Sequence, residues 1–163
     1  MNQIILFFLI STISLNGYAQ KNSIVSIDSV IFNLPSEDWK LTGNYEEGGQ
    51  YMFENKKAKQ AVSISSRYKT KFEFYKEGLS DFDLVNVFFK WDADYWKTVD
   101  GCEVNEIKRD SVQKFIIWIL KTPKGENYSL YGLKHNHLIG INIDKKSFPK
   151  NEAIGFLEKA YLN

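Results

Sequence analysis

Residues 102–144 read CEVNEIKRDSVQKFIIWILKTPKGENYSLYGLKHNHLIGINID, and this stretch decides the fold. Its apolar runs predict strands at Cys102–Lys108, Val112–Lys121, Asn127–Lys134 and Leu138–Asp144. The connections carry turn residues, Pro123 and Gly125 in one and Asn136 in another. Strands joined by hairpins pair antiparallel, so the stretch predicts an antiparallel meander.

Upstream of the meander, the sequence predicts short strands followed by a long helix. Apolar runs indicate strands at 31–34, 51–53 and 61–65, and a short helical piece is expected over 71–78. Ser80 and Asp83 have the spacing of a capping box, which predicts a helix that runs to about Lys97 and stops before Gly101.

A second helix is expected at the C-terminal end of the chain. It should start after Ser147-Phe148-Pro149, with Ile154, Leu157 and Tyr161 on one side. The order of elements therefore predicts an α+β fold, in which a meander-rich antiparallel sheet is packed by a long central helix and a C-terminal helix.

Residues 1–19 have the pattern of a secretory signal peptide. An apolar run over residues 4–15 is followed by Gly17-Tyr18-Ala19, which predicts cleavage between Ala19 and Gln20. No Lys or Arg precedes the apolar run, which leaves an uncleaved membrane anchor as the alternative. The predicted organisation is a signal peptide at 1–19, a short lead-in at 20–29 and one α+β domain at 30–163. The mature chain is expected to be exported, periplasmic or extracellular, with no stable membrane insertion.

The charge composition argues against a nucleic-acid partner. There are 21 basic and 20 acidic residues, so no strong field would steer a polyanion to the chain. Only Arg67 and Arg109 are arginines, the residue suited to bidentate contacts with phosphate and guanine. Abundant Lys, Asn and Ile with scarce Arg is typical of an AT-rich genome, which favours a bacterial origin.

The opening of the domain carries a family resemblance. Phe32-Asn33-Leu34-Pro35-Ser36-Glu37-Asp38-Trp39 resembles the start of Mog1/PsbP-like domains, where an apolar strand is followed by Pro, a short turn and Trp. The order of strands, long helix, meander and terminal helix is similar as well, over residues 30–162. This resemblance implies an antiparallel sheet between helices. It also implies binding of partners as the usual role, and no functional residue carries over.

No catalytic, metal or cofactor site is predicted. His135 and His137 flank a predicted turn without a third ligand, and Cys102 has no neighbouring positive charge to activate it. Asp92, Asp94 and Asp100 lack the spacing of a calcium loop. Nucleotide-binding glycine motifs are missing.

The long helix carries the candidate binding residues, which are Phe89, Trp91, Asp92 and Trp96. Its apolar arc spans roughly 220°, whereas a helix on one face of a core typically needs only about 100°. Either the helix is covered on both sides, or part of the arc is an exposed aromatic patch for a partner. Asp92 lies inside this arc, where a carboxylate needs a hydrogen-bond partner, solvent or a raised pKa.

The expected function is therefore a non-enzymatic binding domain with a protein partner in the cell envelope. Its concrete forms are an immunity or inhibitor protein for an exported toxin, or an envelope accessory factor. One alternative is a small-ligand or lipid carrier with an aromatic-lined cavity. Another is a small hydrolase of envelope polymers, which would need two carboxylates among Asp81, Asp92 and Glu103 to converge in a groove.

Overall fold

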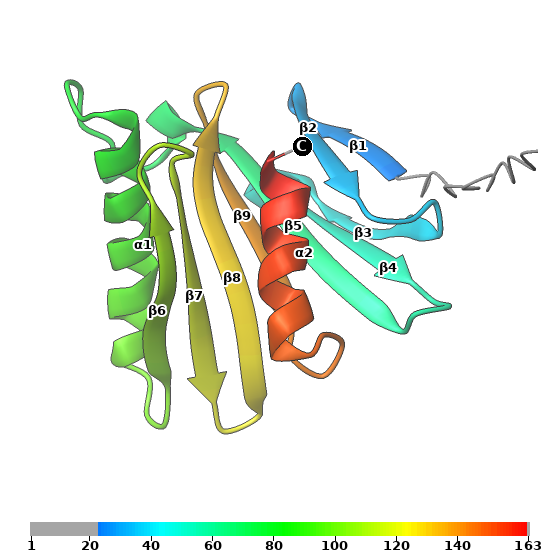
Figure 1. Ribbon diagram of the computed structural model, residues 1–163. Coiled ribbons are helices and arrows are strands. Elements are labelled where there is room, and N and C mark those ends of the chain that lie inside the picture. The colour runs from blue at the N-terminus through cyan, green and yellow to red at the C-terminus, as the bar shows by residue number, and fades with distance from the viewer. Residues whose placement is uncertain (1–22, 163) are drawn as a thin grey trace, which may run out of the picture.

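The computed structural model describes residues 23–162, and the predicted signal peptide lies outside the described residues. Figure 1 shows the order of elements along the chain. The strands are β1 Ser23–Ile27, β2 Val30–Leu34, β3 Trp39–Tyr45, β4 Gln50–Asn55, β5 Gln60–Tyr68, β6 Glu103–Asp110, β7 Phe115–Thr122, β8 Gly125–Lys134 and β9 His137–Asp144. The helices are α1 Asp81–Lys97 and α2 Lys150–Leu162, with 3-10 turns η1 at Glu46–Gly48 and η2 at Lys69–Lys71.

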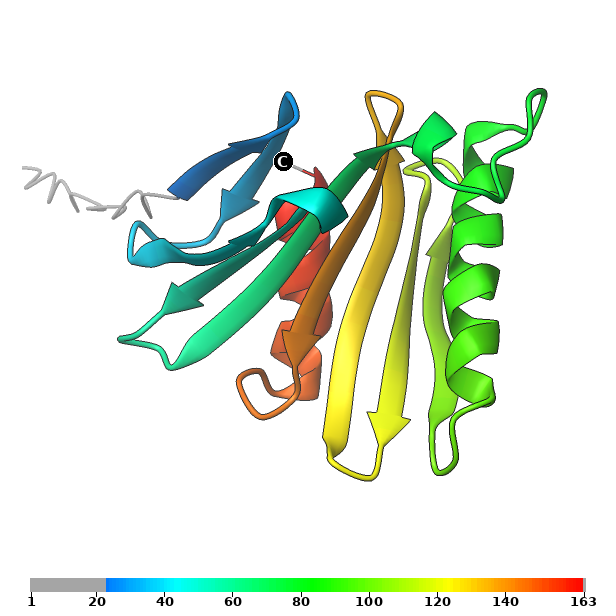
Figure 2. The ribbon, with the colours of Figure 1, turned by 180° about the vertical axis from the view of Figure 1, so that it is seen from behind.

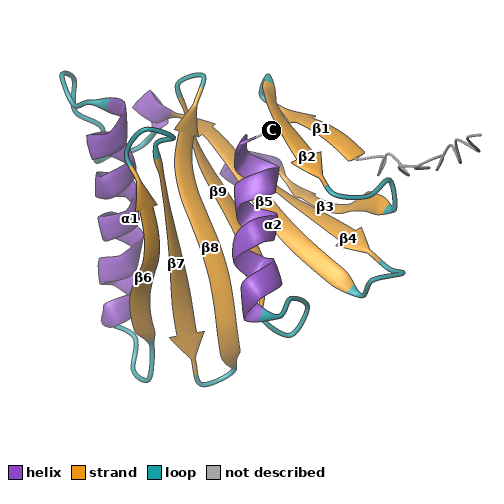
Figure 3. Cartoon of the chain, viewed as in Figure 1, coloured by secondary structure: helices purple, strands orange, loops and turns teal. Residues whose placement is uncertain are grey.

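Seven strands form one antiparallel sheet in the order β3-β4-β5-β9-β8-β7-β6. The runs β3–β5 and β6–β9 each follow chain order, and the pairing of β5 with β9 joins them, for example at Val62 and Ile143. β1 and β2 form a separate hairpin. The expected α+β class, with a large antiparallel sheet and two helices, is confirmed (Figure 3).

The two helices cover opposite faces of the sheet, as the two views in Figures 1 and 2 show. α2 and the β1–β2 hairpin pack on one face, against a core that includes Ile139, Ile141 and Ile143. α1 packs on the other face, where Leu138 of the same strand is buried. β9 therefore contributes side chains to two hydrophobic cores, one on each face of the sheet.

α1 begins and ends where the sequence predicts. The Ser80 hydroxyl accepts a hydrogen bond from the backbone N–H of Asp83 at 3.1 Å and so satisfies a free donor of the first turn. The Ser80 hydroxyl also donates to the Asp83 carboxylate at 2.5 Å. The helix ends at Lys97, and Gly101 adopts a left-handed φ of 76° shortly after.

The predicted turn between the last two strands is also confirmed. His135 and Asn136 have φ values of 48° and 64°, the left-handed pair that a two-residue hairpin turn requires. Asn adopts this conformation more readily than most residues, which explains its place here.

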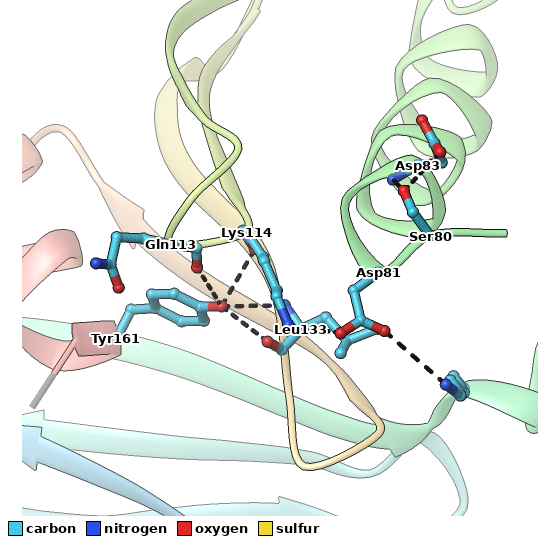
Figure 4. A network of polar contacts seen from close by, with 8 residues as sticks. Ser80, Asp81, Asp83, Gln113, Lys114, Leu133 and Tyr161 are labelled. Carbon is cyan, nitrogen blue, oxygen red and sulfur yellow. Dashed lines mark hydrogen bonds and ion pairs between the residues drawn. The ribbon is translucent and has the colours of Figure 1, made fainter.

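Tyr161, near the C-terminal end of α2, connects the helix to the sheet through hydrogen bonds. The Tyr161 hydroxyl accepts from the Leu133 N–H at 3.1 Å. It also lies 3.0–3.1 Å from the carbonyl oxygens of Gln113, Lys114 and Leu133, to one of which it donates (Figure 4). The ring passes so close to Gly132 that a Cβ there would lie 2.4 Å from it.

Three local expectations are wrong. The helical piece over 71–78 does not form; Phe72 and Phe74 instead pack on Phe88 of α1, and this tertiary contact outweighs local propensity. The lead-in contains strand β1, because pairing with β2 and burial of Ile27 order it. The strand expected from Val112 starts at Phe115, since the Asp110 carboxylate accepts from the N–H groups of residues 112 and 113 and holds them in a turn.

Candidate functional site

The four residues predicted as a binding patch on α1 have different environments. Phe89 is 9% exposed and packs on Trp118 in the core. Asp92 and Trp96 are partly buried. Trp91 is 49% exposed, and Tyr95, one turn further on, is 60% exposed. The exposed surface is therefore narrower than the predicted patch: it includes Trp91 and Tyr95, whereas Phe89 belongs to the core.

The wide apolar arc of α1 is explained by packing on two sides, against the sheet and against the segment between β5 and α1. The sheet covers one side, where Leu84, Val85 and Phe89 are buried. Part of the segment between β5 and α1 covers another side, since Phe72 and Phe74 lie 5.2 and 5.8 Å from the Phe88 ring. Neither cover reaches far enough to bury Trp91, so a strip of aromatic surface remains.

Trp91 is held in place although it is half exposed. Its ring packs on Phe74, with the centroids 5.6 Å apart, and its indole N–H donates to the Glu73 carboxylate at 3.1 Å. Phe74 in turn contacts Phe88, which stacks on Tyr131 of β8 at 4.3 Å. A line of rings thus connects the exposed indole to the sheet, and the orientation of Trp91 is set before any partner arrives.

Asp92 lies between this surface and the core. The Tyr131 hydroxyl donates to its carboxylate at 2.5 Å, and Trp96 also hydrogen-bonds to it. Burial raises the pKa of the Asp92 carboxyl above its usual value, and the two hydrogen bonds oppose this only in part. Burial and the adjacent Asp92 charge raise the pKa of the Tyr131 hydroxyl well above its usual value, so the phenol keeps its proton and remains the donor.

A hollow of about 350 Å³ opens at this point of the helix, lined by Trp91, Asp92 and Tyr95. Tyr95 packs edge-on to Trp96, with the centroids 5.3 Å apart and the planes at 74°. Residues 91 and 95 are i and i+4 neighbours, so their side chains lie on the same side of α1. We call Glu73, Trp91, Asp92 and Tyr95 the α1 aromatic pocket.

The sheet face beside α1 is polar. In Figure 2 neither α1 nor α2 lies in front of β5 and β9 on this side of the molecule. Ser129, Asn142 and Ser63 form one row across β8, β9 and β5, and Gln50 donates to the Ser63 hydroxyl at 2.7 Å. Small hydroxyl and amide side chains therefore line this part of the sheet, where Ser63 and Ser129 are buried and Asn142 is partly buried.

The other carboxylates that a hydrolase would need form ion pairs with lysines. Asp81 forms ion pairs with Lys114 at 2.6 Å and Lys69 at 4.0 Å, and Glu103 pairs with Lys121 at 3.0 Å. Asp81 and Asp92 are eleven residues apart on one helix, which separates them by roughly 16 Å at the usual rise of 1.5 Å per residue. These two carboxylates do not converge, so they cannot act together as the catalytic pair that the hydrolase alternative needs.

The histidines and the cysteine have ordinary local roles. His135 lies in the turn, and the ring of His137 packs edge-on to Tyr68 at 5.3 Å. Cys102 is partly buried against the core under α1. Among residues 23–162, no three His, Cys, Asp or Glu side chains are grouped to hold a metal ion. Over the same residues, neither helix is long and apolar enough to span a membrane.

Comparison with known proteins adds no family to this picture: the sequence matches no protein-family model and none of the curated proteins searched. Function is therefore inferred from the geometry of this chain. Sequence reasoning missed Glu73 and Tyr131, which contact α1 from 18 and 39 residues away in the chain. The conflict between the charge of Asp92 and its apolar neighbours was the signal that a polar partner had to exist.

Proposed function

We propose that the protein is an exported, non-enzymatic α+β domain that binds a protein partner in the cell envelope through the α1 aromatic pocket. The observation that carries the proposal is Trp91, which is half exposed yet oriented by Phe74 and Glu73. Trp and Tyr are, with Arg, the residues enriched at energetically dominant positions of protein interfaces. A rigid exposed indole loses little conformational freedom when a partner covers it.

The concrete form of the proposal is an immunity or inhibitor protein for an exported toxin, with an envelope accessory factor as the second form. The Mog1/PsbP-like resemblance belongs to the same proposal, with a meander-rich sheet and α1 as the long central helix. Its support is a large antiparallel sheet with helices on both faces. Domains of that kind usually bind partners, which agrees with a surface site on a helix.

The carrier alternative has less support in this structure. Both sheet–helix interfaces of the described chain are filled by buried side chains, with Trp118 and Tyr128 among the largest. The hollow beside Trp91 is bounded by three side chains of one helix, so it is too shallow to enclose a lipid chain.

Site-specific photo-crosslinking tests the proposed function. A photoreactive residue in place of Tyr95 should give a covalent adduct in the envelope of the native host, and Trp91→Ala should abolish it. The matched control is the same photoreactive residue in place of Val112, which is 81% exposed in the turn between β6 and β7. Equal adducts from both positions, or none from position 95, would contradict the proposal.

Two further measurements separate the parts of the proposal. N-terminal sequencing of the protein recovered from the periplasm or medium should begin at Gln20 if the leader is cleaved as proposed. Deletion of the gene should make cells sensitive to a toxin exported by sibling cells if the protein confers immunity. An envelope-assembly defect without toxin sensitivity would favour the accessory role.

A further inference from the structure

The α1 aromatic pocket has the chemistry of a cation receptor. We propose, building on the function proposed above, that it receives one lysine or arginine side chain of the protein partner. The cation would lie against the faces of Trp91 and Tyr95, next to the Asp92 carboxylate. The proposal thus specifies which group of the partner the pocket recognises.

The first argument is the pair of aromatic faces. Trp91 and Tyr95 are 49% and 60% exposed and border the same hollow. Each ring also packs against another aromatic ring, Trp91 against Phe74 and Tyr95 edge-on against Trp96. Cations bind the faces of aromatic rings, with Trp the strongest of the three ring types and Tyr also effective.

The second argument is a carboxylate without a cationic partner. Three other acidic side chains on or beside α1 have one: Asp81 pairs with Lys114, Asp94 with Lys97, and Glu106 with Arg109. Asp92 is hydrogen-bonded only to the neutral groups of Tyr131 and Trp96, and within residues 23–162 no lysine or arginine forms an ion pair with it. A partly buried negative charge of this kind is compensated when a cation binds beside it.

Two further features add to the negative potential and limit the size of the ligand. Glu73 holds a second carboxylate at the edge of the Trp91 ring. The hollow of about 350 Å³ is at the lower end of the range for small-molecule pockets, so it suits a single side chain and not a folded segment. The charge complementarity therefore selects a lysine or arginine over an apolar or acidic anchor.

Titration with amino-acid probes tests this inference on the full chain. The probes are N-acetyl-arginine amide and N-acetyl-lysine amide, with N-acetyl-citrulline amide as the neutral analogue of arginine. The indole N–H resonance of Trp91, assigned by its loss in Trp91→Ala, should move with saturation at millimolar arginine or lysine probe. The citrulline probe should bind about 2- to 5-fold more weakly, in line with cation–π energies measured at exposed sites.

The variants divide the site into its parts. Trp91→Ala should lower the affinity for the crosslinked partner at least about 30-fold, as expected for a dominant interface residue. Asp92→Asn keeps an acceptor for the Tyr131 hydroxyl but removes the charge, and it should lower arginine-probe binding while the fold persists. Tyr45→Ala, another exposed aromatic at 59% exposure on β3, is the matched control and should leave binding unchanged.

The outcomes distinguish this inference from the proposed function. A position-95 crosslink together with equal binding of the arginine and citrulline probes would overturn the cation pocket and leave partner binding intact. Tighter binding of tetramethylammonium than of either amino-acid probe would overturn the side-chain assignment, because the site would then favour a free small cation. Probe binding without a position-95 crosslink would overturn the proposed protein partner and leave only a pocket that binds cations.

Discussion

Replacing Tyr161 by Phe removes one hydroxyl and leaves the buried ring in place. That hydroxyl accepts from the Leu133 N–H at 3.1 Å and donates to one of three carbonyl oxygens at 3.0–3.1 Å. These hydrogen bonds connect the last turn of α2 to β8 and to the turn before β7. The variant therefore tests whether this network, drawn in Figure 4, stabilises the fold.

The expected loss follows from the number of hydrogen bonds. Each bond contributes about 0.5–1.5 kcal/mol net, so loss of one donated and one accepted bond predicts a decrease of about 2 kcal/mol in the free energy of unfolding. Leu133 keeps a longer bond from its N–H to the Lys114 carbonyl at 3.3 Å, which prevents a larger penalty. For a chain of this size the melting temperature should fall by roughly 4–8 °C.

The pH dependence gives a second, independent expectation. Burial raises the pKa of Tyr161 to about 12, whereas an unfolded tyrosine titrates near 10. Because the folded state keeps the proton longer, this tyrosine's contribution to stability is complete below about pH 10 and declines as the pH rises toward 12. The Phe variant lacks this decline, so the stability difference between the two proteins should narrow above about pH 10.

Urea denaturation followed by tryptophan fluorescence measures both effects. Tyr45→Phe is the matched control, because Tyr45 is 59% exposed and its variant should stay within about 0.5 kcal/mol of the wild type. A Tyr161→Phe variant that is as stable as this control at neutral pH would refute the reasoning. A gap that stays constant up to about pH 12 would refute the assignment of the alkaline decline to Tyr161.

Other substitutions probe the close packing, the cap and the site. Gly132→Ala should lower the free energy of unfolding by about 1–3 kcal/mol in urea melts, because its Cβ would lie 2.4 Å from the Tyr161 ring. Gly155→Ala, with no atom within 4 Å of its Cβ, should instead raise it by about 0.5–1 kcal/mol. Ser80→Ala should cost about 1 kcal/mol through the lost cap, measured the same way. Asp92→Asn should be at least as stable as the wild type at about pH 7, and this advantage should shrink in acid, because burial raises the pKa of the Asp92 carboxyl and the charged form is the costly one.

The sequence marked α1 as the place of the candidate site, but it could not show which residues of the helix are exposed. The width of the apolar arc on α1 and the presence of Asp92 within it both indicated an unusual helix. The sequence could not say that Phe72 and Phe74 cover one flank, because they come from a segment without regular structure that packs on α1 through rings. It also could not separate buried Phe89 from exposed Trp91, since both belong to the same apolar arc.

The sequence by itself determined the elements whose causes are local. Ser80 satisfies a donor three residues away, Asn136 adopts a left-handed turn conformation, and alternation along β9 sets which isoleucines share a face. Only the tertiary structure decided which strands meet and which charges are compensated. The pairing of β5 with β9 and the bond from Tyr131 to Asp92 join residues far apart in the chain. Their physical basis is burial and hydrogen bonding that exist only after the chain has folded, so no local pattern encodes them.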